Sequence, residues 1–141
     1  MKPQDKRKAR IIALKGIYAY EMEGSNLDDT FEYMLNDTSN SMAVINYGRK
    51  LSDLVLKNTV KIDSLIKDRS KNWDFNRIAS IDKLILRISL VEMIYVEDIP
   101  LKVSIAEGVE IAKEFSTNDS SSFINGILDA VYNQKVKEET L

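Results

Sequence analysis

Residues that break helices are scarce in this chain, because its 141 residues include only five glycines and two prolines. A fold with many tight turns needs more of these two residue types, since they supply the backbone conformations that turns require. The spacing of apolar residues points the same way. Along most of the chain they recur every three or four positions, the period that places them on one face of a helix. The sequence therefore predicts an all-α protein.

About seven helical segments follow from this periodicity. They are expected near residues 6–22, 27–35, 41–67, from 73–75 onward, 80–95, 100–115 and from 118 onward. The segment at 80–95 is apolar around much of its circumference, which predicts the most buried helix. Pro100 fixes the start of the segment that follows it, while Asn118 and Asp119 can cap the last helix. We expect two packed sub-bundles arranged around residues 80–95.

Composition indicates a globular protein in the cytoplasm. Hydrophobic residues make up 44% of the chain and charged residues 30%, the balance of a soluble domain. No apolar run approaches the roughly 20 residues that a bilayer span needs. Lys15 and Glu21 interrupt the first segment, so it does not resemble a secretory signal. We expect one domain over residues 1–134 and a charged, frayed tail over residues 135–141.

The chain contains neither cysteine nor histidine. These absences remove the usual zinc ligands and the commonest general base at neutral pH. Two pairs of carboxylates could in principle hold a metal or act on a substrate, Asp28 with Asp29 and Glu107 with Glu110. Both pairs have the spacing of ordinary charges on a helix surface. The sequence thus predicts a binding protein with no catalytic site, no metal and no cofactor.

The strongest local charge lies at the start of the first expected helix. Residues 1–15 hold six lysines and arginines against Asp5 alone, a sum of +5, so the remainder of the chain sums to −7. Four of these cations are Lys6, Arg7, Lys8 and Arg10. Such a cluster fits a phosphate backbone, because arginine can donate two hydrogen bonds to one phosphate and lysine adds a point charge. A solvated basic helix end would have the same composition.

Four segments, in order along residues 6 to about 130, carry a resemblance to a known family. They are KRKARIIALKGIYAYE, IDKLILRISLVEM, IPLKVSIAEGVEIAKEFS and SSSFINGILD. The last contains an FxNGxLD pattern, which amphipathic spacing alone does not generate. Together they resemble the NusB family of bacterial transcription antitermination factors. Ala106 stands where the family usually has Asn, Val91 where it has an aromatic residue, and the basic cluster is less rich in arginine.

The resemblance implies an adaptor function and a set of contact residues. Members pair with the ribosomal protein NusE, recognise a short single-stranded boxA-type leader element of nascent ribosomal RNA, and join the elongating RNA polymerase. Some relatives self-associate, so a homodimer is an open alternative. By motif match, the residues expected to contact RNA are Lys6, Arg7, Lys8, Arg10, Tyr18, Asp119 and Phe123. Asp82 and Glu92 are expected on the side that binds the protein partner.

Several of these residues also have purely structural interpretations. Tyr18 can be a half-buried core aromatic, Phe123 a core residue, and Asp119 a helix cap. Trp73 is expected to anchor a helix junction. Gly126 is unfavourable inside a helix, which predicts close helix packing there, with the adjacent Asn amide bonded to a neighbouring loop.

Two other functions remain open from the sequence. One is a helical adaptor that binds only proteins, with its basic helix on an acidic surface. The other is a detached RNA-binding domain similar to the one that precedes the catalytic domain of certain ribosomal RNA cytosine methyltransferases. The chain has no glycine-rich GxGxxG motif, so the catalytic part of such an enzyme is not expected in it.

Overall fold

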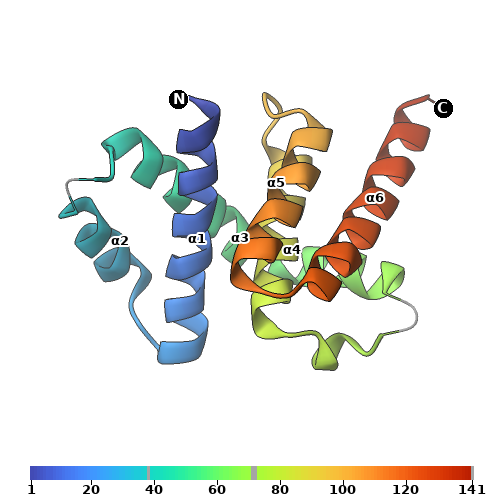
Figure 1. Ribbon diagram of the computed structural model, residues 1–141, viewed down its shortest axis with the longest axis horizontal. Coiled ribbons are helices and arrows are strands. Elements are labelled where there is room, and N and C mark those ends of the chain that lie inside the picture. The colour runs from blue at the N-terminus through green and yellow to red at the C-terminus, as the bar shows by residue number, and fades with distance from the viewer. Residues whose placement is uncertain (38, 71–72, 141) are drawn as a thin grey trace. The chain divides into compact units, whose positions relative to one another are not determined.

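The computed structural model describes residues 1–37, 39–70 and 73–140. Within these ranges there are six α-helices, one 3-10 helix and no strand, which confirms the all-α prediction (Figure 1). The elements are α1 (Pro3–Glu23), α2 (Leu27–Leu35), α3 (Met42–Arg69), η1 (Phe75–Arg77), α4 (Ser80–Tyr95), α5 (Leu101–Phe115) and α6 (Asn118–Thr140). The helix expected from residues 73–75 is only the three-residue turn η1.

The chain divides into two compact units, Met1–Lys57 (the N-terminal unit) and Asn58–Leu141 (the C-terminal unit). Helix α3 contributes to both. Asn58 interrupts it with φ −118° and ψ 18°, outside the helical region, at the point where one unit ends and the other begins. No helix in the described ranges is long and apolar enough to cross a membrane.

The N-terminal unit packs α1 and α2 with the first part of α3. Its apolar cluster is formed by Ala9, Ile12, Leu27, Phe31, Val44 and Ile45. Helix α1 begins with Pro3 in its first turn, where a missing N–H costs nothing, and the Asp5 carboxylate accepts a hydrogen bond from the Lys2 backbone at 3.1 Å. It ends at Gly24, whose φ of 70° favours glycine.

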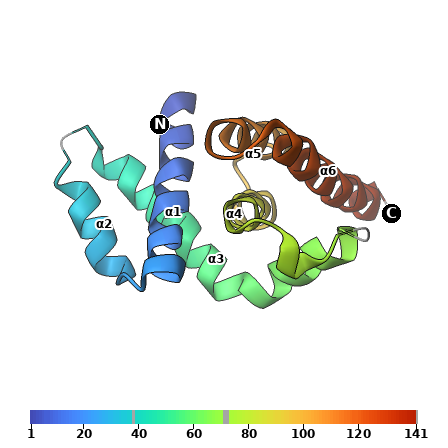
Figure 2. The same ribbon diagram turned by 60° about the horizontal axis from the view of Figure 1, so that its bottom comes forward.

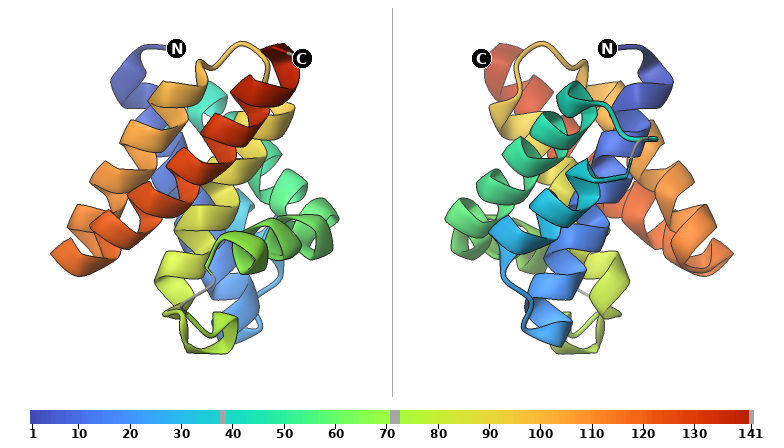
Figure 3. Two further views of the ribbon diagram at one scale, coloured as in Figure 1. Left: turned by 90° about the vertical axis from the view of Figure 1, so that its right-hand side faces the viewer. Right: turned by 90° about the vertical axis from the view of Figure 1, so that its left-hand side faces the viewer.

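The C-terminal unit is built on α4. Its side chains are buried without a break from Leu84 to Met93, as expected for the 80–95 segment. Figure 2 looks almost along α4 and shows α5 and α6 covering one side of it, with η1 on another. Helices α5 and α6 run side by side in Figure 3. Pro100 precedes the first residue of α5, where the sequence predicted a helix start.

An ion pair joins α4 to the second part of α3. The Arg87 Nε and Nη2 atoms donate to Asp63 Oδ1 and Oδ2 at 2.8 and 2.9 Å. The two side chains are only 11% and 15% exposed. A bidentate pair has one preferred geometry, so it sets the rotation of α4 more sharply than apolar contacts alone do.

Two details of the last helix differ from the sequence-based expectations. Thr117, not Asn118 or Asp119, caps α6, because its Oγ1 atom accepts a hydrogen bond from the Ser120 backbone at 3.0 Å. The helix then continues to Thr140, through most of the segment 135–141 that was expected to fray, while residue 141 lies outside the described ranges.

The explanation predicted for Gly126 is wrong. A Cβ atom at this position would meet nothing within 4 Å, so no neighbouring helix packs closely against it. Nor does the adjacent amide reach a loop: Asn125 Nδ2 donates to Asp129 Oδ2 at 3.3 Å, one turn further along α6. Close packing occurs instead at Gly108 in α5, where a Cβ would lie 2.4 Å from Ser89 Oγ of α4.

Replacing Asp63 with Asn should destabilise the protein by about 3 kcal/mol, because the mostly buried Arg87 guanidinium loses a charged bidentate partner. Urea unfolding followed by the fluorescence of Trp73, the single tryptophan, measures the change in the C-terminal unit. Glu110→Ala is the matched control, since its ion pair with Lys113 is about half exposed and should contribute less than about 0.5 kcal/mol. Equal effects of the two substitutions would contradict this role of the Arg87 pair.

Two glycine-to-alanine substitutions should have opposite effects on the stability of the protein. Gly126→Ala fills open space and gains helix propensity, so it should stabilise α6 by up to about 1 kcal/mol. Gly108→Ala should destabilise by about 1–3 kcal/mol, because its methyl group overlaps Ser89. Combining Gly108→Ala with Ser89→Ala should recover most of the loss. Thermal unfolding of the three variants measures these changes, and a destabilising Gly126→Ala would contradict the open position of that residue.

Candidate nucleic-acid interface

The first two turns of α1 carry the basic cluster predicted from the sequence. Arg7 is exposed, and Lys6 and Lys8 are half-buried, with Lys2 exposed just before the helix. Positive charge therefore reaches solvent from at least three consecutive positions of one helix end. The only acidic residue in this stretch is Asp5, whose carboxylate is bonded to the backbone of Lys2.

Lys8 also contacts the segment between α2 and α3. Its Nζ atom donates to the Ser39 backbone carbonyl at 2.6 Å, and the Asp37 carboxylate accepts a hydrogen bond from the Ser39 backbone N–H at 2.9 Å. Hydrogen bonds from Ser39 hold the pKa of Asp37 below its ordinary value, with a smaller contribution from the charge of Lys8. Lys8 is thus held in place by a backbone carbonyl of the N-terminal unit, and its positive charge interacts with the nearby Asp37 carboxylate.

Arg10 and Tyr18 are placed differently from the exposed cations. Arg10 is only 3% exposed, so its guanidinium does not reach solvent in this structure. Tyr18 is half-buried, as its structural interpretation predicted. It lies eleven residues beyond Arg7, about three turns, so the two side chains leave α1 in nearly the same direction. Sequence patterning could not distinguish Arg10 from its exposed neighbours.

Asp119 and Phe123 belong to the C-terminal unit and line a hollow of about 270 Å³. Asp119 is exposed and Phe123 is half-buried at the start of α6. The Phe123 ring meets Trp73 edge to face, with centroids 5.4 Å apart and an interplanar angle of 61°. Trp73 is nevertheless 62% exposed. The rest of the lining is Arg77, Ile78, Ala79, Asp82 and Ser120.

The two residues expected on the partner side are both buried. Asp82 is 5% exposed, and its Oδ2 atom accepts a hydrogen bond from Ser120 Oγ at 2.7 Å. Its Oδ1 atom is buried and has no hydrogen-bond partner among the described residues, and Asp82 is part of the lining of the hollow beside Phe123. Glu92 is 1% exposed and accepts a hydrogen bond from Ser104 Oγ at 2.7 Å. The expectation that Glu92 faces a partner is therefore not supported, because its carboxylate faces the interior.

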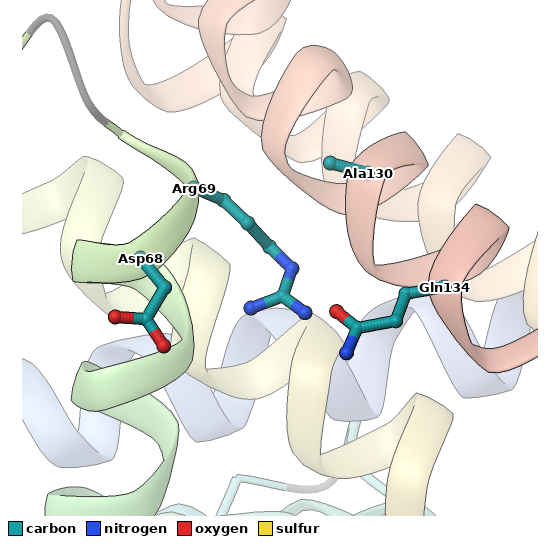
Figure 4. A pocket seen from close by; sticks show the side chains of 4 residues that line it. All are labelled: Asp68, Arg69, Ala130 and Gln134. Atoms are coloured by element: carbon teal, nitrogen blue, oxygen red, sulfur yellow. The ribbon is translucent and has the colours of Figure 1, made fainter. Parts of the chain in front are cut away.

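Two further hollows follow the same face of α6. One, of about 460 Å³, is lined by Arg69, Ser70, Trp73, Ser122, Phe123, Gly126 and Ile127. The other, of about 470 Å³, is lined by Asp68, Arg69, Ala130 and Gln134. In Figure 4 the Arg69 guanidinium extends from the end of α3 toward Gln134 on α6. The first of these hollows shares Trp73 and Phe123 with the hollow beside Asp119, and Arg69 lines both further hollows.

Trp73 lines two of these hollows, although the sequence predicted a different role for it. It was expected to anchor a helix junction, yet most of its ring faces solvent beside Phe123. A lone tryptophan in a polar, lysine- and arginine-containing connection was a usable signal, since exposed aromatic rings next to cations are typical of surfaces that bind unpaired bases.

The profile of a known family covers nearly the whole chain: the NusB family model matches residues 7–133. The chain belongs to the NusB family. It is 40% identical, over 130 residues, to the transcription antitermination protein NusB of Chloroherpeton thalassium. That alignment covers 92% of this chain but 62% of the relative, so the chain spans less than two thirds of that protein's length.

Solved structures of NusB proteins share the fold. Thermotoga maritima NusB is 31% identical with a TM-score of 0.80, and the match covers 89% of each chain. A crystal structure of the antitermination factors NusB and NusE in complex with double-stranded RNA contains a chain with the same TM-score at 22% identity. That match covers 93% of this chain and 98% of the other. At this identity the second likeness supports the fold alone.

The two departures from the NusB pattern lie in different environments. Val91 is fully buried in α4, so an aliphatic side chain fills the place where the family usually has an aromatic ring. Ala106 is exposed on α5, and it makes no contribution to the apolar core there. The first substitution affects packing within the fold, and the second affects the surface.

Ser120→Ala should destabilise the protein by about 2 kcal/mol, because the buried Asp82 carboxylate loses its hydrogen-bond donor. Ser122→Ala, two residues along the same helix and exposed, is the control and should change the free energy of unfolding by less than about 0.5 kcal/mol. Urea unfolding monitored by circular dichroism compares them. If Ser120→Ala were as mild as the control, the Asp82 bond would not be stabilising.

Proposed function

We propose that this chain is a transcription antitermination factor that binds a single-stranded boxA-type leader element of nascent ribosomal RNA. In this proposal it acts together with the ribosomal protein NusE and couples the RNA to the elongating polymerase. The observation that carries the proposal is the group of cations in the first two turns of α1, in a chain that belongs to the NusB family.

The position of this group argues for an anionic ligand. Cations are favoured at the C-terminal end of a helix and disfavoured at its N-terminal end, where the helix dipole is positive. Lys6, Arg7 and Lys8 lie at the unfavourable end, so helix stability does not explain them. Their fields and the dipole instead add at one place, which favours the binding of phosphate groups.

The C-terminal unit by itself presents an aromatic surface that suits RNA. Trp73 presents a mostly exposed ring supported edge-on by Phe123, and Asp119 lies at the rim of the same hollow. Unpaired bases stack on such rings, and each stacked base contributes about 1–3 kcal/mol to the free energy of binding. We therefore retain Asp119 and Phe123 as RNA-contacting residues and add Trp73.

The buried residues take other roles in the proposal. Arg10 is assigned to the interior of the protein, and Tyr18 contributes only its exposed edge to RNA contact. Of the two carboxylates expected near NusE, Asp82 keeps a place at the interface because it borders an open hollow. The proposed role requires no catalytic step, no metal and no cofactor from this chain, and its site of action is the cytoplasm.

The test is fluorescence-anisotropy binding to the leader element of the organism's own ribosomal RNA operon and to a scrambled RNA, with and without its NusE. We expect tighter binding to the true element, strengthened by NusE. The triple substitution of Lys6, Arg7 and Lys8 with Ala should lower the slope of log K against log salt by about 2, because each phosphate contact with a single strand contributes about 0.7.

Lys15→Ala is the matched control, since Lys15 is an exposed cation further along the same helix. It should bind like the unmodified protein. Equal binding to both RNAs in the presence of NusE would reduce the proposal to a nonspecific RNA binder. No binding to either RNA, with NusE still bound, would leave an adaptor that contacts only proteins.

A further inference from the structure

A second group of cations surrounds the ring of Phe75 in the C-terminal unit. Lys67 Nζ, near the end of α3, lies 4.9 Å from the ring centroid, and Lys83 Nζ, in the first part of α4, lies 4.5 Å from it. The two ammonium groups are therefore at most 9.4 Å apart, the sum of these distances. One aromatic side chain thus holds two like charges from different helices close together.

Nearby carboxylates do not neutralise this pair. Within residues 1–37, 39–70 and 73–140, neither Lys67 nor Lys83 makes an ion pair, and Lys67 is exposed. Asp74 and Asp82 accept hydrogen bonds from uncharged groups and make no ion pair with these lysines: Asp74 Oδ1 accepts from the Asn76 backbone at 3.0 Å, and Asp82 accepts from Ser120. A contact between an ammonium group and a ring at the surface is weak, which leaves both charges available to an anion.

The sequence concentrates positive charge at this place. Residues 67–83 hold five lysines and arginines against three aspartates, a net charge of +2. Residues 84–141 hold five lysines and arginines against ten aspartates and glutamates, a net charge of −5. The segment that contains Phe75 is therefore positive in sequence within an otherwise acidic part of the chain, and local charge, not net charge, decides anion binding.

One feature connects this region to an RNA strand and not to an acidic peptide. The turn η1 that carries Phe75 also places Arg77 at the hollow lined by Trp73 and Phe123. Cations next to an exposed aromatic ring suit a chain that alternates phosphates and bases.

We propose that Lys67 and Lys83, which lie at the ring of Phe75, and Arg77, which follows Phe75 in the turn η1, form a second phosphate-binding surface for single-stranded RNA. The strand runs past η1, with its phosphates on these cations and a base on Trp73. This inference rests on the proposed function, and it adds a set of backbone contacts in the C-terminal unit to those of α1. Such contacts position the strand and carry no sequence preference of their own.

The experiment measures binding of the full chain to a labelled 12-nucleotide leader RNA over a series of salt concentrations. Lys67→Ala with Lys83→Ala should lower the slope of log K against log salt by about 1.4, that is, two single-strand phosphate contacts. Lys67→Arg with Lys83→Arg should keep the slope, because the charge is retained. Lys113→Ala with Lys137→Ala removes two exposed lysines elsewhere in the unit and should also leave it unchanged. Circular dichroism confirms that each variant is folded.

The outcomes separate this inference from the proposed function. If the double alanine variant keeps the slope of the unmodified protein while the α1 variant loses it, the second surface is overturned and the function stands. If the unmodified protein binds no RNA, both are overturned. If a poly-glutamate chain of the same length binds as tightly as the RNA and with the same dependence on Lys67 and Lys83, the surface is a docking site for acidic proteins and the inference is wrong.

Discussion

The C-terminal unit depends on the bidentate ion pair between Arg87 and Asp63. Helix α4 is buried from Leu84 to Met93, and apolar packing on all sides tolerates small rotations. A guanidinium and a carboxylate at 2.8 and 2.9 Å accept one arrangement only. Once α4 is fixed in this way against α3, Ser89 can lie against Gly108 of α5, and Asp82 can accept its hydrogen bond from Ser120 of α6.

Positive and negative charges are separated along the chain. For the binding of an anion, this separation matters more than the net charge of the whole chain. The net charge of −2 conceals a basic start of α1 and a basic region around η1. The first lies at a helix end where the dipole already favours anions, and the second gathers around the aromatic rings of Phe75 and Trp73. Each of the two regions, taken by itself, has charges that suit an anionic ligand.

The local sequence pattern predicted most of the helices, but it predicted only some of the features of the candidate site. The limits of α2 and the start of α5 at Pro100 agree with the sequence, because capping and periodicity are properties of neighbouring residues. Burial of charged residues was not predictable in the same way. Arg10 and Glu92 look like surface positions in the sequence, yet both are buried, and Glu92 accepts its hydrogen bond from Ser104 on the next helix.

The sequence by itself determined that the chain is helical, that its central helix is apolar all round, and that α1 begins with a basic cluster. It also determined the family, through motifs that are local strings of residues. Only the tertiary structure decided which polar side chains face solvent, that Trp73 meets Phe123, and that Lys67 and Lys83 share the ring of Phe75. The physical reason is that helix formation depends on contacts within a few residues, whereas these pairs join residues up to 50 positions apart.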